Sequence, residues 1–163
     1  MFLLKQILSV AVALLVAAGG WLVSESGGRT VTGPARITDG DSLRVNGVEI
    51  RLKGVDAPEM RQTCERAGRP YRCGEEARRV LSERIGDGSL TCRIEGRDRY
   101  RRALARCRVD GADLGAWLVE QGWAVGYRDY EREEARARRR RAGLWVGEFQ
   151  RPIDWRREHT ARS

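Results

Sequence analysis

Histidine is almost absent from this chain, and that scarcity excludes several kinds of chemistry. His159, near the C-terminal end, is the only histidine among 163 residues. Nucleases and phosphodiesterases that use histidine as a metal ligand, or a pair of histidines as catalysts, are therefore excluded. A serine triad would also lack its general base. Carboxylates and arginines remain as the groups that could carry out hydrolysis.

Lysine and closely spaced cysteines are scarce as well. Lys5 and Lys53 are the only lysines among 31 basic residues, a skew that often reflects genome base composition. The formal net charge is +8, which fits a partner rich in phosphate. No two cysteines stand in a C-x-x-C spacing, which argues against a zinc site. The chain also has no visible internal repeat.

The four cysteines form an even set, which favours disulfides in an exported protein. Three pairings are open. We favour Cys64 with Cys73, because this bridge would pin one irregular loop. We favour Cys92 with Cys107, because both lie about seven residues from the centre of a predicted hairpin and would face each other. The alternative for the second pair is two free, buried cysteines.

The first residues resemble a targeting segment rather than part of a domain. Lys5 precedes an apolar run that continues to Val23 and is rich in small residues. Residues 1–25 are therefore expected to be a signal peptide, or an uncleaved membrane anchor, followed by a polar linker at 26–31. Both alternatives predict an exported protein, periplasmic or secreted. Membrane contact is expected through this segment only.

The remaining chain predicts one α+β domain over residues 32–148. Alternating apolar residues, with Asn46-Gly47 as a hairpin signal, predict a three-stranded meander and then a later hairpin. Helical spacing predicts about three helices, the first after the meander. Strands are expected at 35–38, 42–45, 48–53, 89–95 and 103–109, and helices at 75–85, 112–121 and 132–142. This order matches a five-stranded OB-fold-type β-barrel with packed helices. Residues 60–74 are expected to form a loop, and 149–163 a frayed polar tail.

Three carboxylates follow strands whose ends could meet. Asp41 and Asp56 come after separate strands of the predicted barrel, and Glu59 follows closely. Calcium prefers six to eight oxygen ligands from carboxylates, backbone carbonyls and water. Asp41, Asp56 and the carbonyl of Ala57 are therefore candidate calcium ligands. Glu59 is left to orient or deprotonate a water. Taken alone, residues 39–41 are typical of an ordinary turn, with Asp39 as the turn former, and residues 56–59 are typical of a loop start. The hypothesis of a calcium site rests on their combination.

Arginines near these acids could bind a phosphate. Arg51 lies on the return strand of the meander, and Arg102 lies in a loop that also contains Arg99 and Tyr100. A guanidinium can hold two phosphate oxygens at once, although most arginines in so basic a chain are solvated surface residues. Tyr100, Tyr127 and Tyr130 are candidates for stacking on bases. The alternative for Tyr127 and Tyr130 is a place in the core.

These residues resemble the staphylococcal nuclease-like, or thermonuclease, family. The resemblance covers about residues 31–146. Four motifs carry it in the family's order: ITDGDS at 37–42, RLKGVDAPE at 51–59, DRYRRALA at 98–105 and LVEQGWA at 118–124. Arg101 stands where the family usually has glycine, and the register makes Arg102 the second functional arginine. Ala57 replaces a threonine found in some members, which is harmless where only the carbonyl is needed.

The resemblance implies an OB-fold barrel and calcium-dependent cleavage of DNA and RNA that leaves 3′-phosphates. It assigns calcium to Asp41, Asp56 and the Ala57 carbonyl, with Arg51 and Arg102 on the scissile phosphate. Glu59 would act on the water, and Tyr100 would lie near the nucleotide. We therefore expect an exported, monomeric, calcium-dependent nuclease. The rival hypothesis is a non-catalytic OB-fold module that binds nucleic acid or another polyanion.

Overall fold

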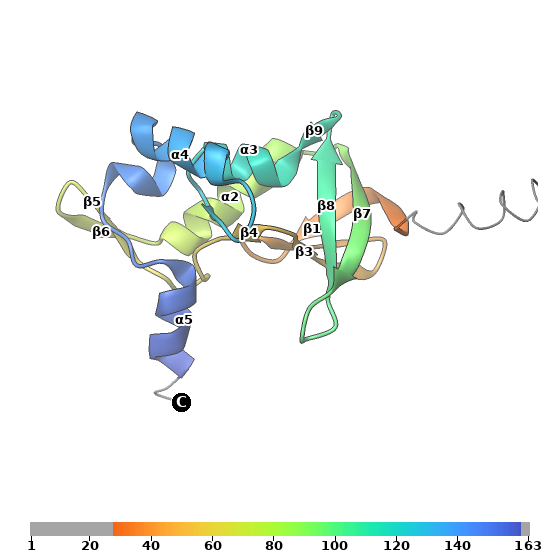
Figure 1. Ribbon diagram of the computed structural model, residues 1–163, viewed down its shortest axis with the longest axis horizontal. Coiled ribbons are helices and arrows are strands. Elements are labelled where there is room, and N and C mark those ends of the chain that lie inside the picture. The colour runs from red at the N-terminus through yellow and green to blue at the C-terminus, as the bar shows by residue number, and fades with distance from the viewer. Residues whose placement is uncertain (1–27, 161–163) are drawn as a thin grey trace, which may run out of the picture.

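The computed structural model of the protein describes residues 28–160. Five strands form a closed, mixed barrel: β1 (Thr30–Ile37), β2 (Ser42–Val45), β3 (Val48–Leu52), β7 (Ser89–Arg97) and β8 (Ala103–Val109). Antiparallel neighbours follow the order β3-β2-β1-β7-β8, and a parallel pairing between β3 and β8 closes the barrel. The predicted α+β fold with a five-stranded barrel is confirmed (Figure 1).

The meander forms because its turn and its alternation agree. Asn46 and Gly47 both adopt positive φ, at 47° and 78°, as a two-residue hairpin loop between β2 and β3 requires. Leu43, Val45 and Ile50 are almost fully buried, whereas the intervening Arg44 is exposed. One face of each strand therefore fills the barrel interior, and this register places Ser42 opposite Arg51.

Four α-helices lie among residues 28–160, one more than the sequence predicted. They are α2 (Cys73–Ile85), α3 (Leu114–Glu120), α4 (Glu131–Arg140) and α5 (Pro152–Thr160), with a short 3-10 helix at Gly143–Val146. Short strands complete the fold: β4 (Val55–Asp56) pairs with β10 (Val125–Gly126), β5 (Cys64–Arg66) with β6 (Arg69–Tyr71), and β9 (Ala112–Asp113) extends β8. None of the helices within 28–160 is both long and apolar enough to cross a bilayer.

Three segments that were expected to lack regular structure contain a strand or a helix. β1 begins at Thr30, inside the segment expected to be a linker at 26–31. The expected loop at 60–74 contains the β5–β6 hairpin, because the Cys64–Cys73 bridge holds its two ends together. The expected frayed tail at 149–163 contains the helix α5. The segment 1–25, expected to be a signal peptide or anchor, lies outside the described residues.

Local features fix where the helix α5 begins. Pro152 occupies its first position, where a fixed φ favours the helix and the missing N–H has no intrahelical partner to lose. The carbonyl of Arg151 accepts hydrogen bonds from the backbone N–H groups of Asp154 and Trp155, at 2.9 and 3.0 Å. The Trp155 and His159 rings stack at 3.9 Å. In Figure 1, α5 projects from the lower edge of the domain.

Both disulfides have the pairing favoured from the sequence. Cys64 is bonded to Cys73, and Cys92 to Cys107. Cys92 and Cys107 are directly opposed on β7 and β8, deep in the core. One bridge therefore lies within the barrel, and the other fixes the hairpin that precedes α2. Two disulfides are consistent with an oxidising compartment.

Candidate active site

The turn between β1 and β2 holds Asp41 inside the protein. The side chain of Asp39 accepts a hydrogen bond from the backbone N–H of Asp41 at 3.0 Å, so Asp39 is the turn former expected from the sequence. Gly40 allows a close approach, since an added Cβ would lie 2.7 Å from the Cβ of Ala57. Asp41 is only 4% exposed. The turn therefore packs directly against the segment that follows Asp56.

Arg51 joins the two buried aspartates. Its Nη1 donates to Oδ1 of Asp41 at 2.9 Å, and its Nη2 donates to Oδ1 of Asp56 at 3.0 Å. Asp56 lies on β4 and is 2% exposed. The backbone N–H of Ala57 donates to Oδ2 of Asp41 at 3.1 Å. Residues from three separate segments thus meet at one end of the barrel.

Burial changes the chemistry of Asp41. Removal from water raises the pKa of this carboxyl to about 7, although the neighbouring Arg51 guanidinium acts to lower it. The carboxylate also accepts hydrogen bonds from the Ser42 hydroxyl and the Ala57 N–H. These donors and Arg51 do not offset the desolvation. An additional cation beside Asp41 would favour its ionised form.

Glu59 is linked to Asp56 by Arg156, an arginine that the sequence analysis did not select. Nη1 of Arg156, on α5, donates to Oε1 of Glu59 at 2.8 Å and lies 2.9 Å from Oδ1 of Asp56. Its Nη2 donates to the other Asp56 oxygen at 3.2 Å. The result is an alternating series of acids and arginines in the order Asp41, Arg51, Asp56, Arg156, Glu59.

Arg102 approaches Asp41 from the other side. It belongs to the β7–β8 turn, which we define as residues 98–102. Its Nη1 donates to the Ser42 hydroxyl at 3.2 Å, and that hydroxyl donates to Asp41 at 2.9 Å. Its Nε donates to Asp98 at 2.8 Å. Arg101 is exposed and adopts a φ of 68°, a conformation that favours glycine. Arg102, rather than Arg101, therefore reaches the acids.

The aromatic candidates fall into two groups. Tyr100 is 65% exposed at the tip of the β7–β8 turn, with the guanidinium groups of Arg99 and Arg102 at 4.7 and 5.6 Å from its ring centre. Tyr127 is 47% exposed, and its backbone N–H bonds to the carbonyl of Gly54. These exposed rings are available for stacking.

Tyr130 does not join the site. It is buried among core residues, its hydroxyl donates to Asp113 at 3.1 Å, and it accepts from Arg106 at 2.8 Å. Burial, together with the Asp113 carboxylate, raises its pKa, so the hydroxyl stays neutral. Tyr130 is thus the core tyrosine that the sequence left open as an alternative.

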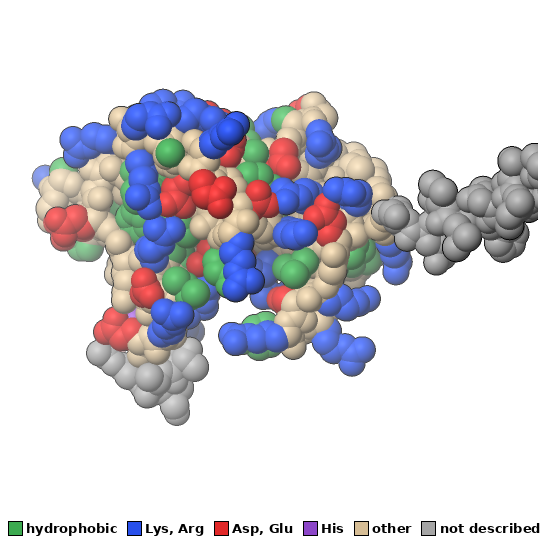
Figure 2. Space-filling model, viewed as in Figure 1, with side chains coloured by type: hydrophobic (Ala, Val, Ile, Leu, Met, Phe, Trp, Pro, Cys, Tyr) green, Lys and Arg blue, Asp and Glu red, His purple; other side chains and the backbone are tan. Residues whose placement is uncertain are grey.

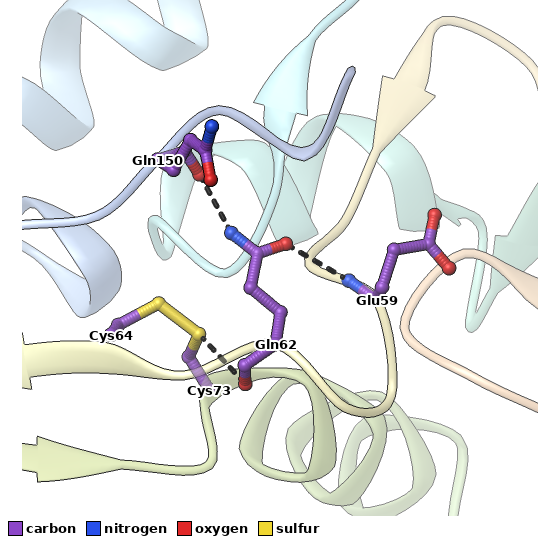
Figure 3. Close-up of a disulfide and its surroundings, with 5 residues drawn as sticks. All are labelled: Glu59, Gln62, Cys64, Cys73 and Gln150. Atoms are coloured by element: carbon purple, nitrogen blue, oxygen red, sulfur yellow. Dashed lines mark hydrogen bonds between the residues drawn. A yellow bond between two sulfur atoms is a disulfide. The ribbon is translucent and has the colours of Figure 1, made fainter. Parts of the chain in front are cut away.

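A buried glutamine fixes the backbone next to Glu59. The side-chain oxygen of Gln62 accepts from the Glu59 N–H at 3.2 Å, and its nitrogen donates to the carbonyl of Gln150 at 2.7 Å (Figure 3). Gln62 is fully buried, and its own carbonyl lies 3.4 Å from Sγ of Cys73. The Cys64–Cys73 bridge, the Glu59 loop and the segment before α5 are therefore connected through one residue.

The acids lie between two projecting elements. Arg156 enters from α5, and Arg102 enters from the β7–β8 turn. Figure 2 shows a hollow on this face between those two elements, with basic side chains on both sides. An anionic chain in this hollow would meet basic side chains on both sides.

The candidate calcium ligands are of the chemical type that this ion prefers. Asp41 and Asp56 supply hard oxygen atoms in a buried setting, which is the ligand type that calcium prefers. Residues 28–160 contain no group of three or more acidic, histidine or cysteine side chains arranged to hold a metal. A calcium ion here would therefore need carbonyl oxygens, water and substrate to complete its ligands. Both aspartates are paired with guanidinium groups, and Asp41 also accepts hydrogen bonds from Ser42 and Ala57.

Comparison with protein families agrees with this geometry. The family model described as "Staphylococcal nuclease homologue" matches residues 49–147, more than half of the chain. The chain belongs to the staphylococcal nuclease family. Members of this family typically depend on calcium. The match includes Arg51, Asp56, Glu59 and Arg102, and it ends before α5.

Three curated relatives extend the comparison. The succinoglycan biosynthesis protein ExoI of Rhizobium meliloti is 38% identical over 124 residues, covering 71% of this chain and 64% of that protein. A probable staphylococcal-like nuclease of rice, CAN1, is 30% identical over 126 residues, covering 73% of this chain and 35% of that protein. An uncharacterized endonuclease of Haemophilus influenzae is 27% identical over 135 residues, covering 76% and 71%. The chain thus spans less than two thirds of the first two relatives.

Sequence reasoning missed Arg156 and Gln62. Arg156 was assigned to a frayed tail because residues 150–163 are polar; Pro152, a residue typical of a first helical position, was the available signal for a helix there. Gln62 has no comparable signal, because a glutamine in a charged segment is usually exposed. Its importance follows from its complete burial, which only the fold decides.

Proposed function

We propose that this chain is an exported, calcium-dependent nuclease that hydrolyses phosphodiester bonds of DNA, RNA or both and leaves 3′-phosphates. Family membership supports nuclease chemistry on nucleic acid. The single observation that carries the proposal is the convergence of Asp41, Asp56 and Glu59 with Arg51 and Arg102 at one end of the barrel. The two disulfides and the predicted targeting segment support export.

Arg51 and Arg102 would bind the scissile phosphate. Each guanidinium group is held by a carboxylate: Arg51 by Asp41 and Asp56, and Arg102 by Asp98. Negative charge builds on the phosphate oxygens as water attacks phosphorus, and fixed donors stabilise that charge without rearranging. Tyr100 and Arg99, exposed on the β7–β8 turn, would contact the neighbouring nucleotide, as would the exposed Tyr127.

Glu59 would orient or deprotonate the attacking water. Its carboxylate is about one third exposed, at 36%, whereas Asp41 and Asp56 are buried. An exposed acid beside two buried ones is suited to exchange protons with solvent. Attack of the water oxygen on phosphorus would break the bond to the 5′ oxygen. The leaving oxygen takes up a proton, and the phosphate remains on the 3′ side.

Asp41, Asp56 and the carbonyl of Ala57 would hold calcium. When bound, calcium would supply positive charge beside the phosphate oxygens. The protein's part is to keep both carboxylates close together and largely free of water. Arg51 does this for both aspartates, and the Ala57 N–H fixes the second oxygen of Asp41.

The test is a cleavage assay on purified protein with plasmid DNA and with single-stranded RNA. We expect degradation with calcium and none with a chelator, and mass spectrometry of the products should find phosphate at the 3′ ends. Glu59→Gln should lower turnover by about 10²–10⁴-fold at unchanged fold. Absence of calcium-dependent cleavage of either substrate across pH 6–10 would refute the proposal.

The rival proposal of a non-catalytic module predicts a different outcome from the same variant. A binding module would retain nucleic acid with equal affinity in the wild type and in Glu59→Gln, and neither protein would shorten the substrate. A filter-binding measurement beside the cleavage assay separates the two. The complete set of acids and arginines favours the enzyme.

A further inference from the structure

The helix α5 places a third arginine among the acids of the site. Arg156 contacts both oxygens of Asp56, at 2.9 and 3.2 Å, and Oε1 of Glu59 at 2.8 Å. Its side chain is one third exposed. The residue lies beyond the matched family region, which ends at residue 147. The contact therefore belongs to a part of this chain that the family model does not describe.

Arg156 bridges Asp56 and Glu59 in the same way that Arg51 bridges Asp41 and Asp56. Each arginine joins Asp56 to one other acid, so the order of charges alternates without interruption. Without Arg156, the Asp56 and Glu59 carboxylates would face each other with no cation between them, and like charges at short range repel. Glu59 has no other ion pair among the described residues. Its carboxylate orientation thus depends on Arg156.

The segment that carries Arg156 is attached to the core at several points. Gln62 donates to the carbonyl of Gln150, immediately before α5, and accepts from the backbone N–H of Glu59 (Figure 3). Arg151 reaches Glu134 on α4 at 3.3 Å. Gln62 is fully buried, so its two hydrogen bonds are shielded from water. The same residue thus fixes the Glu59 backbone and the start of the segment that holds the Glu59 side chain.

We propose that Arg156 is a positioning residue of the active site, which holds the Glu59 carboxylate at a fixed place beside Asp56. The proposal rests on the nuclease function proposed above. Both terminal nitrogens of Arg156 donate to carboxylates, so one rigid, planar group sets the spacing of the two acids. The helix α5 is then part of the catalytic site, and Gln62 connects it to the Glu59 loop.

The test compares variants of neighbouring arginines on one helix in the full chain. Arg156→Ala is expected to lower kcat about 10–100-fold, because small displacements of a reacting group have effects of this size. KM should stay within about twofold of wild type, since the contact with Glu59 does not act on substrate binding. The half-saturating calcium concentration is expected to change, because Arg156 also contacts Asp56, a proposed calcium ligand. Arg156→Lys should recover activity only in part, because an ammonium group cannot hold two carboxylates in a planar fork.

Arg157→Ala is the matched control. Arg157 is 73% exposed, and within residues 28–160 it pairs only with Asp154 on its own helix, so this variant should behave like wild type. Thermal stability gives a second measurement, which does not depend on catalysis. Without calcium, Arg156→Ala should lower Tm by about 3 °C or more relative to Arg157→Ala. In a Glu59→Gln background that difference should become smaller, because the neutral amide has lost the ion pair while the two Asp56 contacts remain.

The outcomes separate this inference from the nuclease proposal. An inactive wild type overturns the nuclease function. An active wild type with Arg156→Ala equal to Arg157→Ala in kcat overturns this inference alone. A rise in KM at unchanged kcat would show that Arg156 binds substrate. Higher activity at lower calcium would show that Arg156 inhibits the enzyme. Either result overturns the positioning role. A Tm loss that Glu59→Gln leaves untouched would reduce Arg156 to a structural residue, which also overturns it.

Discussion

Two elements deliver an arginine to the same acids, and they differ in how each is held. The β7–β8 turn is organised by contacts within a few residues: Asp98 accepts from the backbone N–H groups of Tyr100 and Arg102 and from the Arg102 side chain. The helix α5 depends on partners far along the chain, since Arg156 contacts residues 97 and 100 positions away. The turn is held by local hydrogen bonds, although its contact with Ser42 is tertiary, whereas α5 is held in place by tertiary contacts.

This difference explains which arginine could be predicted. A local network leaves a compact signature in the sequence, so the turn is recognisable from residues 98–105 alone. A tertiary contact leaves no such signature, and Arg156 was therefore assigned to a frayed polar tail. The two elements should also respond differently to damage, because the turn remains ordered wherever its own hydrogen bonds form, whereas α5 needs Gln62 to connect it to the Glu59 loop.

The largest expected effect concerns the β7–β8 turn. Arg102→Ala should lower kcat by roughly 10²–10³-fold, equivalent to about 2.7–4 kcal/mol of barrier, because a fixed donor to the developing charge is lost. Arg101→Gly is the control: Arg101 is exposed at a φ of 68°, which glycine adopts freely, so activity should be unchanged. If Arg101→Gly is the damaging variant, the assignment of the functional arginine was wrong. Steady-state kinetics with plasmid DNA measure both.

The two disulfides test whether the Glu59 loop depends on the bridge that lies next to Gln62. Replacing Cys92 and Cys107 by alanine, or Cys64 and Cys73 by alanine, should each lower the free energy of unfolding by about 3 kcal/mol. Denaturant titration measures this loss. Only the second pair should also lower the kcat of the folded protein, because Cys73 lies against the backbone of Gln62. Equal kcat values for both double variants would show that the bridge next to Gln62 does not support the Glu59 loop.

A smaller effect is expected at the exposed rings. Tyr100→Ala should weaken substrate binding by about 1 kcal/mol or more, a fivefold or larger rise in KM, because a stacking surface beside the phosphate site is lost. Tyr130→Phe is the contrast, since this ring is buried and its hydroxyl bonds only within the protein; it should lower stability and leave KM unchanged. A rise in KM for Tyr130→Phe would bring that residue back to the substrate.

A pH dependence of stability, rather than an effect on turnover, is expected from Asp41, which ends the series of acids and arginines on the side of Arg102. Its pKa is raised by burial from 3.8 to about 7, so the folded state binds more protons than the unfolded state between these values. Stability in chelator should therefore fall as pH rises from about 4 to about 7. Thermal melts across this range measure the slope, and Asp41→Asn should flatten it. A slope that Asp41→Asn leaves unchanged would assign the titration to other groups.

Most of the barrel could be predicted because its signals are local, whereas the candidate site residues were proposed from motifs in separate parts of the chain. Alternation and Asn46-Gly47 predicted the meander, and the opposed positions of Cys92 and Cys107 predicted their bridge. The β5–β6 hairpin and α5 could not be predicted in the same way. Both are short and polar, and each is held by a bridge or a distant hydrogen bond rather than by an apolar periodicity.

The sequence by itself determined the kinds of groups available to this protein. Scarce histidine excluded whole classes of mechanism, and the family motifs made Asp41, Asp56, Glu59, Arg51 and Arg102 the candidate site residues. Only the tertiary structure decided that Arg156 joins Asp56 to Glu59, that Gln62 connects α5 to the Glu59 loop, and that Tyr130 belongs to the core. The physical reason is that ion pairs and buried hydrogen bonds depend on distance in space, and residues 97 positions apart carry no mutual signal in one sequence.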